Sequence, residues 1–299
     1  MASGDVVISD LEQSSRVSTR AGFTTENVVA LALLLALSIV FIFPFLWTVT
    51  SSLKQPYEIF NFPPTLFPSV PQWKNYAIVF QIAPFFRWIV NSVFVVVIGT
   101  IGVVLTSSVV AYSFARFKYR GRDVIFLITL GTMMLPAQIT LIPQYVLFAR
   151  MGWINTLYPL WVPFWFGGGA FYIFLLRQFF LSLPRELDEA ALIDGAGYFR
   201  IFWTILMPLC IPALATVMII SFIGSWGDFL SPLIYLNSPD IFTIAMGLFF
   251  FQNDPDLGGT PTQHLLMAAA VMTVIPCIVL FFAMQRYFIQ GVVLAGIKG

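Results

Sequence analysis

A charged stretch between two apolar runs carries the residues whose types and spacing best suit a function. Three acidic residues, Glu186, Asp188 and Glu189, directly follow Pro184 and Arg185. Proline is favoured in the first turn of a helix, and acidic side chains there interact favourably with the positive end of the helix dipole. The pattern predicts a short helix that begins near Pro184.

Small residues and glycines follow. Ala190 and Ala191 favour a helix and leave room for close approach by a partner. Gly195, after Asp194, is expected to end the helix, because glycine tolerates left-handed backbone angles. A second short helix, 198–207, should then lead through Pro208 into the next apolar run. Such a rigid projection can transmit rigid-body motion, but the pattern fits a solvated linker equally well.

Signatures of known catalytic sites are missing from the sequence. There is no Gly-x4-Gly-Lys-Ser/Thr phosphate loop, no Gly-x-Ser-x-Gly elbow and no His-Glu-x-x-His motif. The single histidine and the two cysteines, which lie in apolar runs, exclude a multi-histidine metal site and a disulfide framework. A net charge of +1 without a basic stripe argues against nucleic-acid binding. We therefore expect a chain that is not an enzyme and holds no cofactor.

The composition indicates a membrane protein. Hydrophobic residues make up 59% of the chain and charged residues 10%, with a mean hydropathy of +0.89, whereas soluble domains carry about 25% charged residues. Runs without Asp, Glu, Lys or Arg, each longer than the roughly 20 residues that a membrane helix needs, cover 27–53, 88–115, 124–149, 151–176, 201–227 and 257–285. The sequence thus predicts an all-α membrane protein with six transmembrane helices. The lack of charges within the runs argues against a proton-coupled transporter.

The distribution of basic residues predicts the orientation. If both termini lie in the cytosol, 11 of the 15 Lys and Arg residues are on the cytosolic side, where basic residues are enriched. The four on the outer side are Lys54, Lys74, Arg87 and Arg150. Residues 1–27 are then a flexible cytosolic tail. The proline-rich fragment 59–73 is expected to be an extended outer loop. The fragment 241–253 is too short to cross and suits an interfacial or re-entrant helix.

The spacing of Glu189-Ala190-Ala191, Gly195, Ile205 and Pro208 resembles the EAA motif in the coupling loop of the membrane subunits of ABC importers, with Met207 where that family has Leu. From about residue 44 onward, the chain is similar to the second permease of carbohydrate importers of the maltose-transporter type. Further likenesses lie at 91–92, 111–116, 226–229 and 285–288. The resemblance implies a type I ABC importer transmembrane domain.

The resemblance also implies a domain organisation. Residues 28–90 form the first transmembrane helix and an extracytoplasmic loop, and residues 91–286 form the transmembrane domain with its coupling loop at 182–208. Residues 287–299 form a cytosolic tail, which in relatives inserts between the ATPase subunits.

Three sets of contact residues follow from the resemblance. The residues expected to couple to the ATPase are Glu186, Glu189, Ala190, Ala191, Asp194, Gly195 and Pro208. Those expected to make the tail contact are Gln290, Gly291, Lys298 and Gly299. Those expected to touch a binding protein, in a loop whose alternative is a plain flexible connection, are Asn253, Asp254, Asp256, Gly258 and Gly259.

The function that the resemblance implies is that of a permease subunit in an ATP-driven importer of a mono- or oligosaccharide or polyol, located in the inner membrane. Its expected partners are a second homologous permease, two ABC ATPase subunits that bind ATP and Mg²⁺, an extracytoplasmic solute-binding protein and the sugar. Alternatives are an importer for a glycerol phosphodiester or polyamine, a facilitator or channel that works without nucleotide, and a structural scaffold.

Candidates for the solute path are Trp161, Trp165, Gly168 and Tyr172 in the fourth run and Asp228 after the fifth. Aromatic rings suit stacking on sugars, but the mixture of aromatic residues and glycine favours helix packing. Kinks are expected in the spans at Pro159, Pro163, Pro212 and Pro276.

Overall fold

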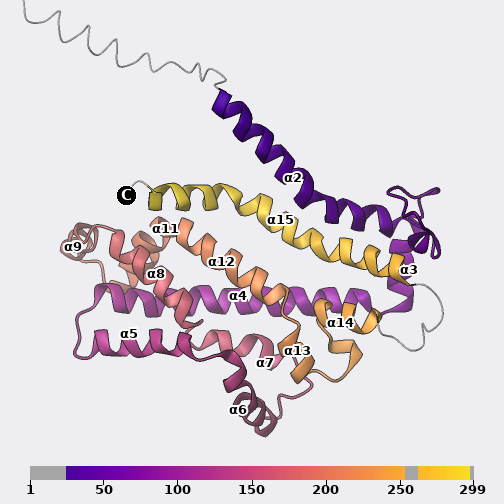
Figure 1. The fold of residues 1–299 in the computed structure, drawn as a ribbon. Coiled ribbons are helices and arrows are strands. Elements are labelled where there is room, and N and C mark those ends of the chain that lie inside the picture. Colours follow the sequence, from indigo (N-terminus) through magenta and orange to yellow (C-terminus); the bar gives the residue numbers. More distant parts are fainter. Residues whose placement is uncertain (1–24, 253–261, 297–299) are drawn as a thin grey trace, which may run out of the picture.

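The fold is helical throughout the part of the chain that the computed structural model describes, residues 25–252 and 262–296, with no β-strand among them (Figure 1). Four stretches are long and apolar enough to cross a membrane: α2 (Thr25–Ser52), α4 (Phe85–Arg116), the segment Tyr158–Ser182 and α15 (Gln263–Gly296). Two bent pairs of helices bring the count to six. With each bent pair counted as one span, the structure agrees with the six predicted spans, two of which are not straight.

The third span is bent by 100° between Met134 and Gln138. It consists of α5 (Arg122–Gly131), the 3₁₀ turn η2 (Thr132–Met134) and α6 (Ala137–Arg150). Pro136 explains the break, because proline disfavours helical angles in the residue before it and lacks a backbone N–H. Leu135 accordingly adopts an extended conformation.

The fifth span is bent by 78° between Leu209 and Ile211. Its first part comprises α10 (Tyr198–Ile201), the π-helical segment η4 (Phe202–Leu206) and α11 (Met207–Leu209), and its second part is α12 (Ile211–Trp226). Pro212 lies in the first turn of α12, directly after the bend, so the span is bent beside this proline as expected, with the turn itself at Cys210.

The fourth span begins later than the apolar run and is interrupted. It comprises α7 (Tyr158–Trp161), the 3₁₀ turn η3 (Val162–Trp165) and α8 (Ala170–Ser182). Pro159 and Pro163 lie in the first turns of α7 and η3, in place of the expected kinks. Between η3 and α8, residues 167–169 are glycines with φ of 97°, 71° and 120°, a region that other residues rarely adopt.

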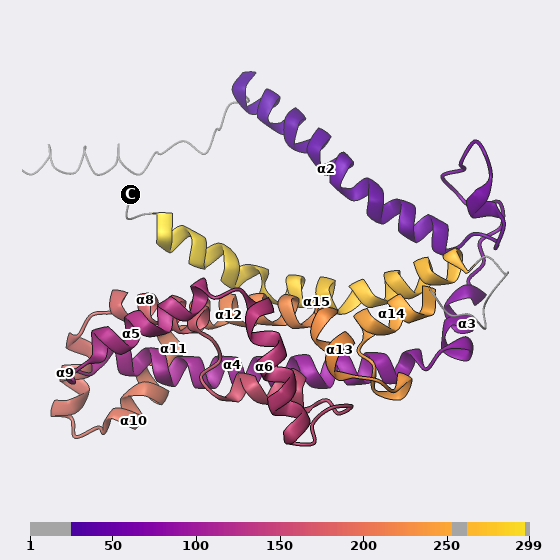
Figure 2. The same ribbon diagram turned by 60° about the horizontal axis from the view of Figure 1, so that its bottom comes forward.

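Helix α4 lies at the centre of the bundle. It contacts α8, α12, α7 and η3 along its length, whereas α15 packs against α12 and α2. Helix α2 diverges from the rest, and its side chains are largely exposed (Figure 2). An exposed apolar helix of this kind suits contact with lipid or with another membrane helix.

Close packing joins the fourth span to α4. A Cβ atom at Gly102 would lie 2.6 Å from the Trp165 ring, and one at Gly168 would lie 2.8 Å from the Val103 carbonyl oxygen. Such spacing leaves no room for a side chain. The geometry agrees with the packing interpretation of Trp165 and Gly168.

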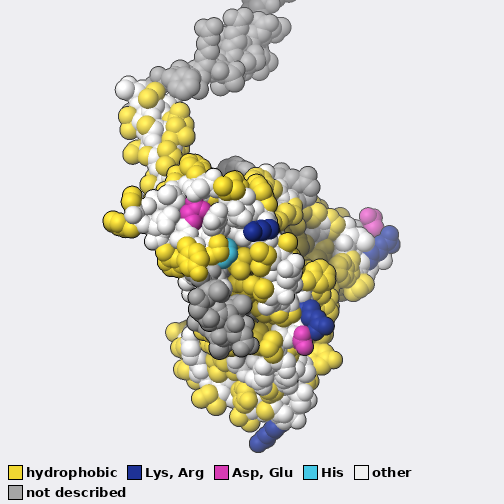
Figure 3. Space-filling model, turned by 90° about the vertical axis from the view of Figure 1, so that its right-hand side faces the viewer, with side chains coloured by type: hydrophobic (Ala, Val, Ile, Leu, Met, Phe, Trp, Pro, Cys, Tyr) yellow, Lys and Arg dark blue, Asp and Glu magenta, His cyan; other side chains and the backbone are white. Residues whose placement is uncertain are grey.

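One end of the bundle holds the outer loop, α3 (Lys74–Ile82), α13 (Leu230–Tyr235), the 3₁₀ turn η5 (Pro239–Ile241) and α14 (Ile244–Gln252). Helix α14 corresponds to the short helix expected at 241–253. Seen from this side, the molecule has a mostly hydrophobic surface on which charged side chains are few and scattered (Figure 3).

The outer loop 53–73 contains only one short 3₁₀ turn, η1 (Glu58–Phe60), and is ordered by two buried charges. The Lys54 ammonium donates to the Thr65 carbonyl at 2.6 Å, and the Glu58 carboxylate accepts from the N–H and hydroxyl of Ser69 at 2.7 and 2.6 Å. Burial lowers the pKa of Lys54. Although burial acts to raise the pKa of Glu58, the hydrogen bonds from Ser69 and Gln55 hold it below its usual value.

The contact between the fourth span and α4 can be tested with Gly168→Ala. The added methyl would meet the Val103 carbonyl in a backbone conformation that disfavours alanine. We expect a loss of about 2–4 kcal/mol in the free energy of unfolding, measured by chemical denaturation in detergent. The control is Gly131→Ala, where no atom lies within 4 Å of the new Cβ. Equal stability of the two variants would contradict this account of the packing.

Candidate coupling site

Helix α9 (Glu186–Ile193) projects at the opposite end of the molecule from α3 (Figure 1). Its first turn carries the three acidic residues. At its end, the Gly195 N–H donates to the Leu192 carbonyl at 3.0 Å and the Ala196 N–H to the Ala191 carbonyl at 2.9 Å, with Gly195 at φ 79°. The predicted short helix and its glycine stop are confirmed.

A buried ion pair ties α9 to the end of α4. The Arg116 Nε lies 3.1 Å from the Asp188 Oδ2, with side chains only 6% and 15% exposed. The same guanidinium donates through Nη2 to the carbonyls of Leu183 and Pro184 at 3.2 and 3.4 Å. Burial raises the pKa of Asp188, and the Arg116 charge opposes that rise. A single side chain of α4 therefore holds both the loop that precedes α9 and its first turn.

Aromatic packing joins the next elements to the same place. The Tyr112 ring of α4 lies 5.2 Å from Phe117, 6.0 Å from Phe180 of α8 and 5.0 Å from Phe202 of η4, between ring centroids. Its hydroxyl donates to the Tyr198 carbonyl at 3.4 Å. The inner face of α9, at Ala191, belongs to the same hydrophobic core. Helices on both sides of the loop are thus packed as one body.

The outer face of α9 is uncovered. Glu186, Glu189 and Ala190 are exposed, as are Asp194 and Gly195 at the helix end. Two large apolar side chains accompany them, Ile193 at 87% and Phe199 at 77% exposure. Phe199 was not among the predicted contact residues, although an aromatic residue in a charged loop is a signal for such a contact. Acidic and apolar groups together make a surface suited to a protein partner.

The exit from this loop differs from the expectation. The segment from α10 to α11 extends to Leu209, so Pro208 lies within α11 and the chain turns at Cys210. The π-helical segment η4 lies between the loop and this bend. Such segments are frequent at functional positions in helices.

Several predicted contact residues lie where the structure gives no side-chain description. Gln290 and Gly291 lie on α15, in a part of the helix where the structure describes the backbone only. Outside the described residues lie Lys298, Gly299, Asn253, Asp254, Asp256, Gly258 and Gly259. Their proposed contacts remain predictions.

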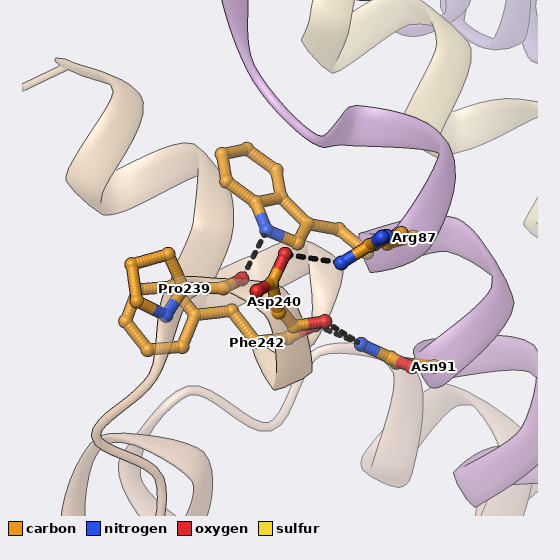
Figure 4. A network of polar contacts seen from close by, with 6 residues as sticks. Arg87, Asn91, Pro239, Asp240 and Phe242 are labelled. Carbon is orange, nitrogen blue, oxygen red and sulfur yellow. Dashed lines mark hydrogen bonds and ion pairs between the residues drawn. The ribbon is translucent and has the colours of Figure 1, made fainter.

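The segment that precedes α14 is fixed to the start of α4 (Figure 4). Arg87 and Asp240 form an ion pair. The Trp88 indole donates to the Pro239 carbonyl at 2.9 Å, and the Asn91 amide donates to the carbonyls of Asp240 and Phe242 at 3.0 and 3.1 Å. The Ser92 hydroxyl also accepts from the Ile244 N–H at 2.7 Å. Five side-chain contacts therefore hold the segment that precedes α14 against α4.

The five residues predicted to line the solute path do not come together at one site. Trp165 and Gly168 pack on α4 as described above, and Tyr172 lies against the core around α8. The Trp161 ring makes an edge contact with Phe94 at 6.1 Å. Asp228 accepts from the Ser231 N–H at 3.2 Å and is the one member of this set that lines a cavity of about 520 Å³. Within the described ranges no cluster of His, Cys, Asp and Glu fits a metal ion.

Comparison with known proteins decides the family. Residues 103–293 match the family described as binding-protein-dependent transport system inner membrane component. The chain belongs to this family. It is therefore a multi-pass membrane protein, a permease subunit of an ABC transport system rather than an enzyme, and such a system includes a partner permease, an ATPase and a solute-binding protein.

Relatives with curated names cover most of the chain. An arabinooligosaccharide transport permease, AraQ, of Halalkalibacterium halodurans is 34% identical over 86% of this chain and 91% of its own length. The diacetylchitobiose uptake permease NgcG of Streptomyces coelicolor is 34% identical over 85% and 83%. The sn-glycerol-3-phosphate permease UgpE of Yersinia enterocolitica is 32% identical over 79% and 85%.

A solved structure has the same fold. One chain of a bacterial ABC transporter involved in the import of the acidic polysaccharide alginate superposes with a TM-score of 0.77. The two sequences are 22% identical, and the match covers 89% of this chain and 99% of the other. The arrangement of helices is thus that of an importer transmembrane domain.

The ion pair between α4 and α9 can be tested with Arg116→Gln. Removing the guanidinium leaves the Asp188 carboxylate buried without its counter-charge, so we expect a loss of about 3 kcal/mol in the free energy of unfolding. The double variant Arg116→Gln/Asp188→Asn should recover part of that loss, since no charge is then stranded. Chemical denaturation of purified protein measures both. A double variant no more stable than Arg116→Gln would contradict the proposed role of the pair.

Proposed function

We propose that the chain is the permease subunit of an ATP-driven importer for a sugar and that α9 is its docking helix for an ATPase subunit. The observation that carries the proposal is the exposed acidic and apolar face of α9 on a helix anchored to α4 by Arg116. The names of AraQ and NgcG support a sugar as the solute.

The mechanism follows from how α9 is attached. Closure of the nucleotide-binding dimer would displace α9 as a rigid body. The Arg116–Asp188 pair would pass that movement to α4, and the segment from α10 to α11 would pass it to α12. Two spans would then tilt together and change access to the path. ATP and Mg²⁺ would bind the partner subunits.

The proposed assembly has four kinds of partner. One is a second homologous permease, which completes the path, and the others are two ATPase subunits, an extracytoplasmic binding protein and the sugar. We place the α9 end and both termini in the cytosol. The basic residues Arg116, Lys118, Arg120 and Arg122 beside α9 support this orientation, because cytosolic loops are enriched in Lys and Arg.

A second candidate solute is a glycerol phosphate compound, which the similarity to UgpE supports. Purified complex in proteoliposomes, supplied with binding protein, separates the candidates. We expect uptake of a neutral sugar, such as arabinotriose or diacetylchitobiose, that requires internal ATP. Uptake of glycerol 3-phosphate would favour the second candidate, and uptake by this chain alone without ATP would overturn the proposal in favour of a facilitator.

The docking role of α9 predicts the effect of Glu189→Lys. Glu189 is exposed and makes no ion pair within the described chain, so reversing its charge should leave folding intact and weaken contact with the ATPase. We expect at least about a tenfold loss of ATP-driven uptake, corresponding to roughly 1.4 kcal/mol.

The matched control is Lys74→Glu, which reverses an exposed charge at the opposite end of the molecule. It should keep normal ATPase stimulation and uptake. Wild-type assembly, ATPase stimulation and uptake in Glu189→Lys would refute the docking role.

A further inference from the structure

A cavity of about 520 Å³ lies outside the coupling site, between α6, the turn 151–157, the fourth span and α13. Aromatic and polar side chains share its wall. The residues used below are Gln144, Phe148, Trp153, Phe166, Asp228 and Tyr235.

Aromatic rings form one side of the cavity. The Phe148 and Trp153 rings are stacked with centroids 5.6 Å apart, and Tyr235 meets Phe148 edge-on at 5.3 Å. Tyr145 stacks on Tyr235 from behind at 6.4 Å. The rings thus support one another and present a rigid apolar wall, against which the C–H face of a sugar ring can pack.

Polar groups converge on the same space. The Asp228 Oδ1 accepts from the Ser231 N–H at 3.2 Å, which fixes the carboxylate at the start of α13. Its second oxygen, Oδ2, has no hydrogen-bond partner among the described residues and can accept from sugar hydroxyls. The Gln144 amide and the Tyr235 hydroxyl add groups that both donate and accept.

Asn155 holds the two sides of the cavity together. It adopts a left-handed conformation with φ 61°, and its N–H donates to the Tyr235 carbonyl at 2.7 Å. Its Oδ1 accepts from the N–H groups of Asn237 and Ser238 at 2.9 and 3.0 Å. The turn that carries Trp153 is thereby bonded to the end of the helix that carries Tyr235, so the cavity is formed in advance of any ligand.

The interruption of the fourth span lies beside this cavity. Phe166, which is 84% exposed, lines it and directly precedes the glycines 167–169. Backbone that is not helical at membrane depth is tolerated where it is buried in protein or faces a polar cavity. Gly168 of the break is buried against α4, and Phe166 at its start lines the cavity.

We propose that this cavity is a sugar-binding subsite that takes one neutral sugar ring, with Trp153 as the stacking surface and Asp228 as the acceptor for ring hydroxyls. The inference rests on the proposed function and narrows its solute class. The Asp228 carboxylate would repel a uronate or phosphate, so the site selects uncharged sugars.

The test uses the complete complex in proteoliposomes with its binding protein, and with arabinotriose, diacetylchitobiose, maltotriose and glycerol 3-phosphate as probes. The variants are Trp153→Ala and Asp228→Asn, the second of which keeps an oxygen that accepts from Ser231. The control is Trp73→Ala, an exposed tryptophan outside the cavity. Uptake and ATP hydrolysis are measured in the same vesicles, after assembly of each complex has been verified.

We expect both variants to lower uptake of the transported neutral sugar about tenfold per ATP hydrolysed, because Asp228→Asn removes a charged acceptor and Trp153→Ala removes the ring on which the sugar packs. ATP hydrolysis should stay near the wild-type rate, and Trp73→Ala should match wild type in both. If Trp153→Ala does not assemble, Asp228→Asn decides.

Three results would overturn the subsite. These are wild-type uptake per ATP in the assembled variants, an equal fall of uptake and hydrolysis that indicates a coupling role, and preferred transport of glycerol 3-phosphate by the wild type. None of these three affects the proposal that the chain is an ATP-driven permease subunit. Two other results would refute the proposed function and the subsite with it. These are transport by the wild type without ATP, and a wild-type complex that transports none of the four probes.

Discussion

The buried ion pair between Arg116 and Asp188 fixes α9 to the membrane helix α4. A short helix such as α9 has few contacts of its own, and its outer face is exposed among the residues that the structure describes. The guanidinium fixes its first turn, and the carbonyls of Leu183 and Pro184 fix the approach to it. Both charges are sheltered from water, so their attraction is screened less than that of a surface pair. The position of α9 is therefore set by α4.

Helix α4 then links two specialised ends. It runs without interruption over 32 residues, which corresponds to about 48 Å. Arg116 at its last turn holds α9, and Arg87 and Asn91 at its first turns hold the segment before α14. Because the third, fourth and fifth spans are interrupted and α4 is not, α4 is the element that would carry a displacement between the two ends in the proposed mechanism. A permease that connects an ATPase to a binding protein needs such an element.

Local signals made most of the fold predictable. Apolar runs gave the spans, and the acidic first turn with Gly195 gave α9. The bend at residue 135, the left-handed glycines 167–169 and the exposure of Phe199 were not predicted. The bend follows from the local Pro136, whereas the glycines depend on a contact between distant segments, Gly168 against Val103. The clamp made by Asn155 was missed for the same reason, since its partners are about 80 positions away.

The π-helical segment η4 has a geometric consequence for α9. Five residues, Phe202–Leu206, are wound more loosely than an α-helix between the loop and the bend at Cys210. Each residue of an α-helix turns the chain by about 100°, so one residue accommodated by this loose winding changes by that angle the face that α10 presents relative to α11. The rotational register between α10 and the bend at Cys210 is thus set by the number of residues in η4.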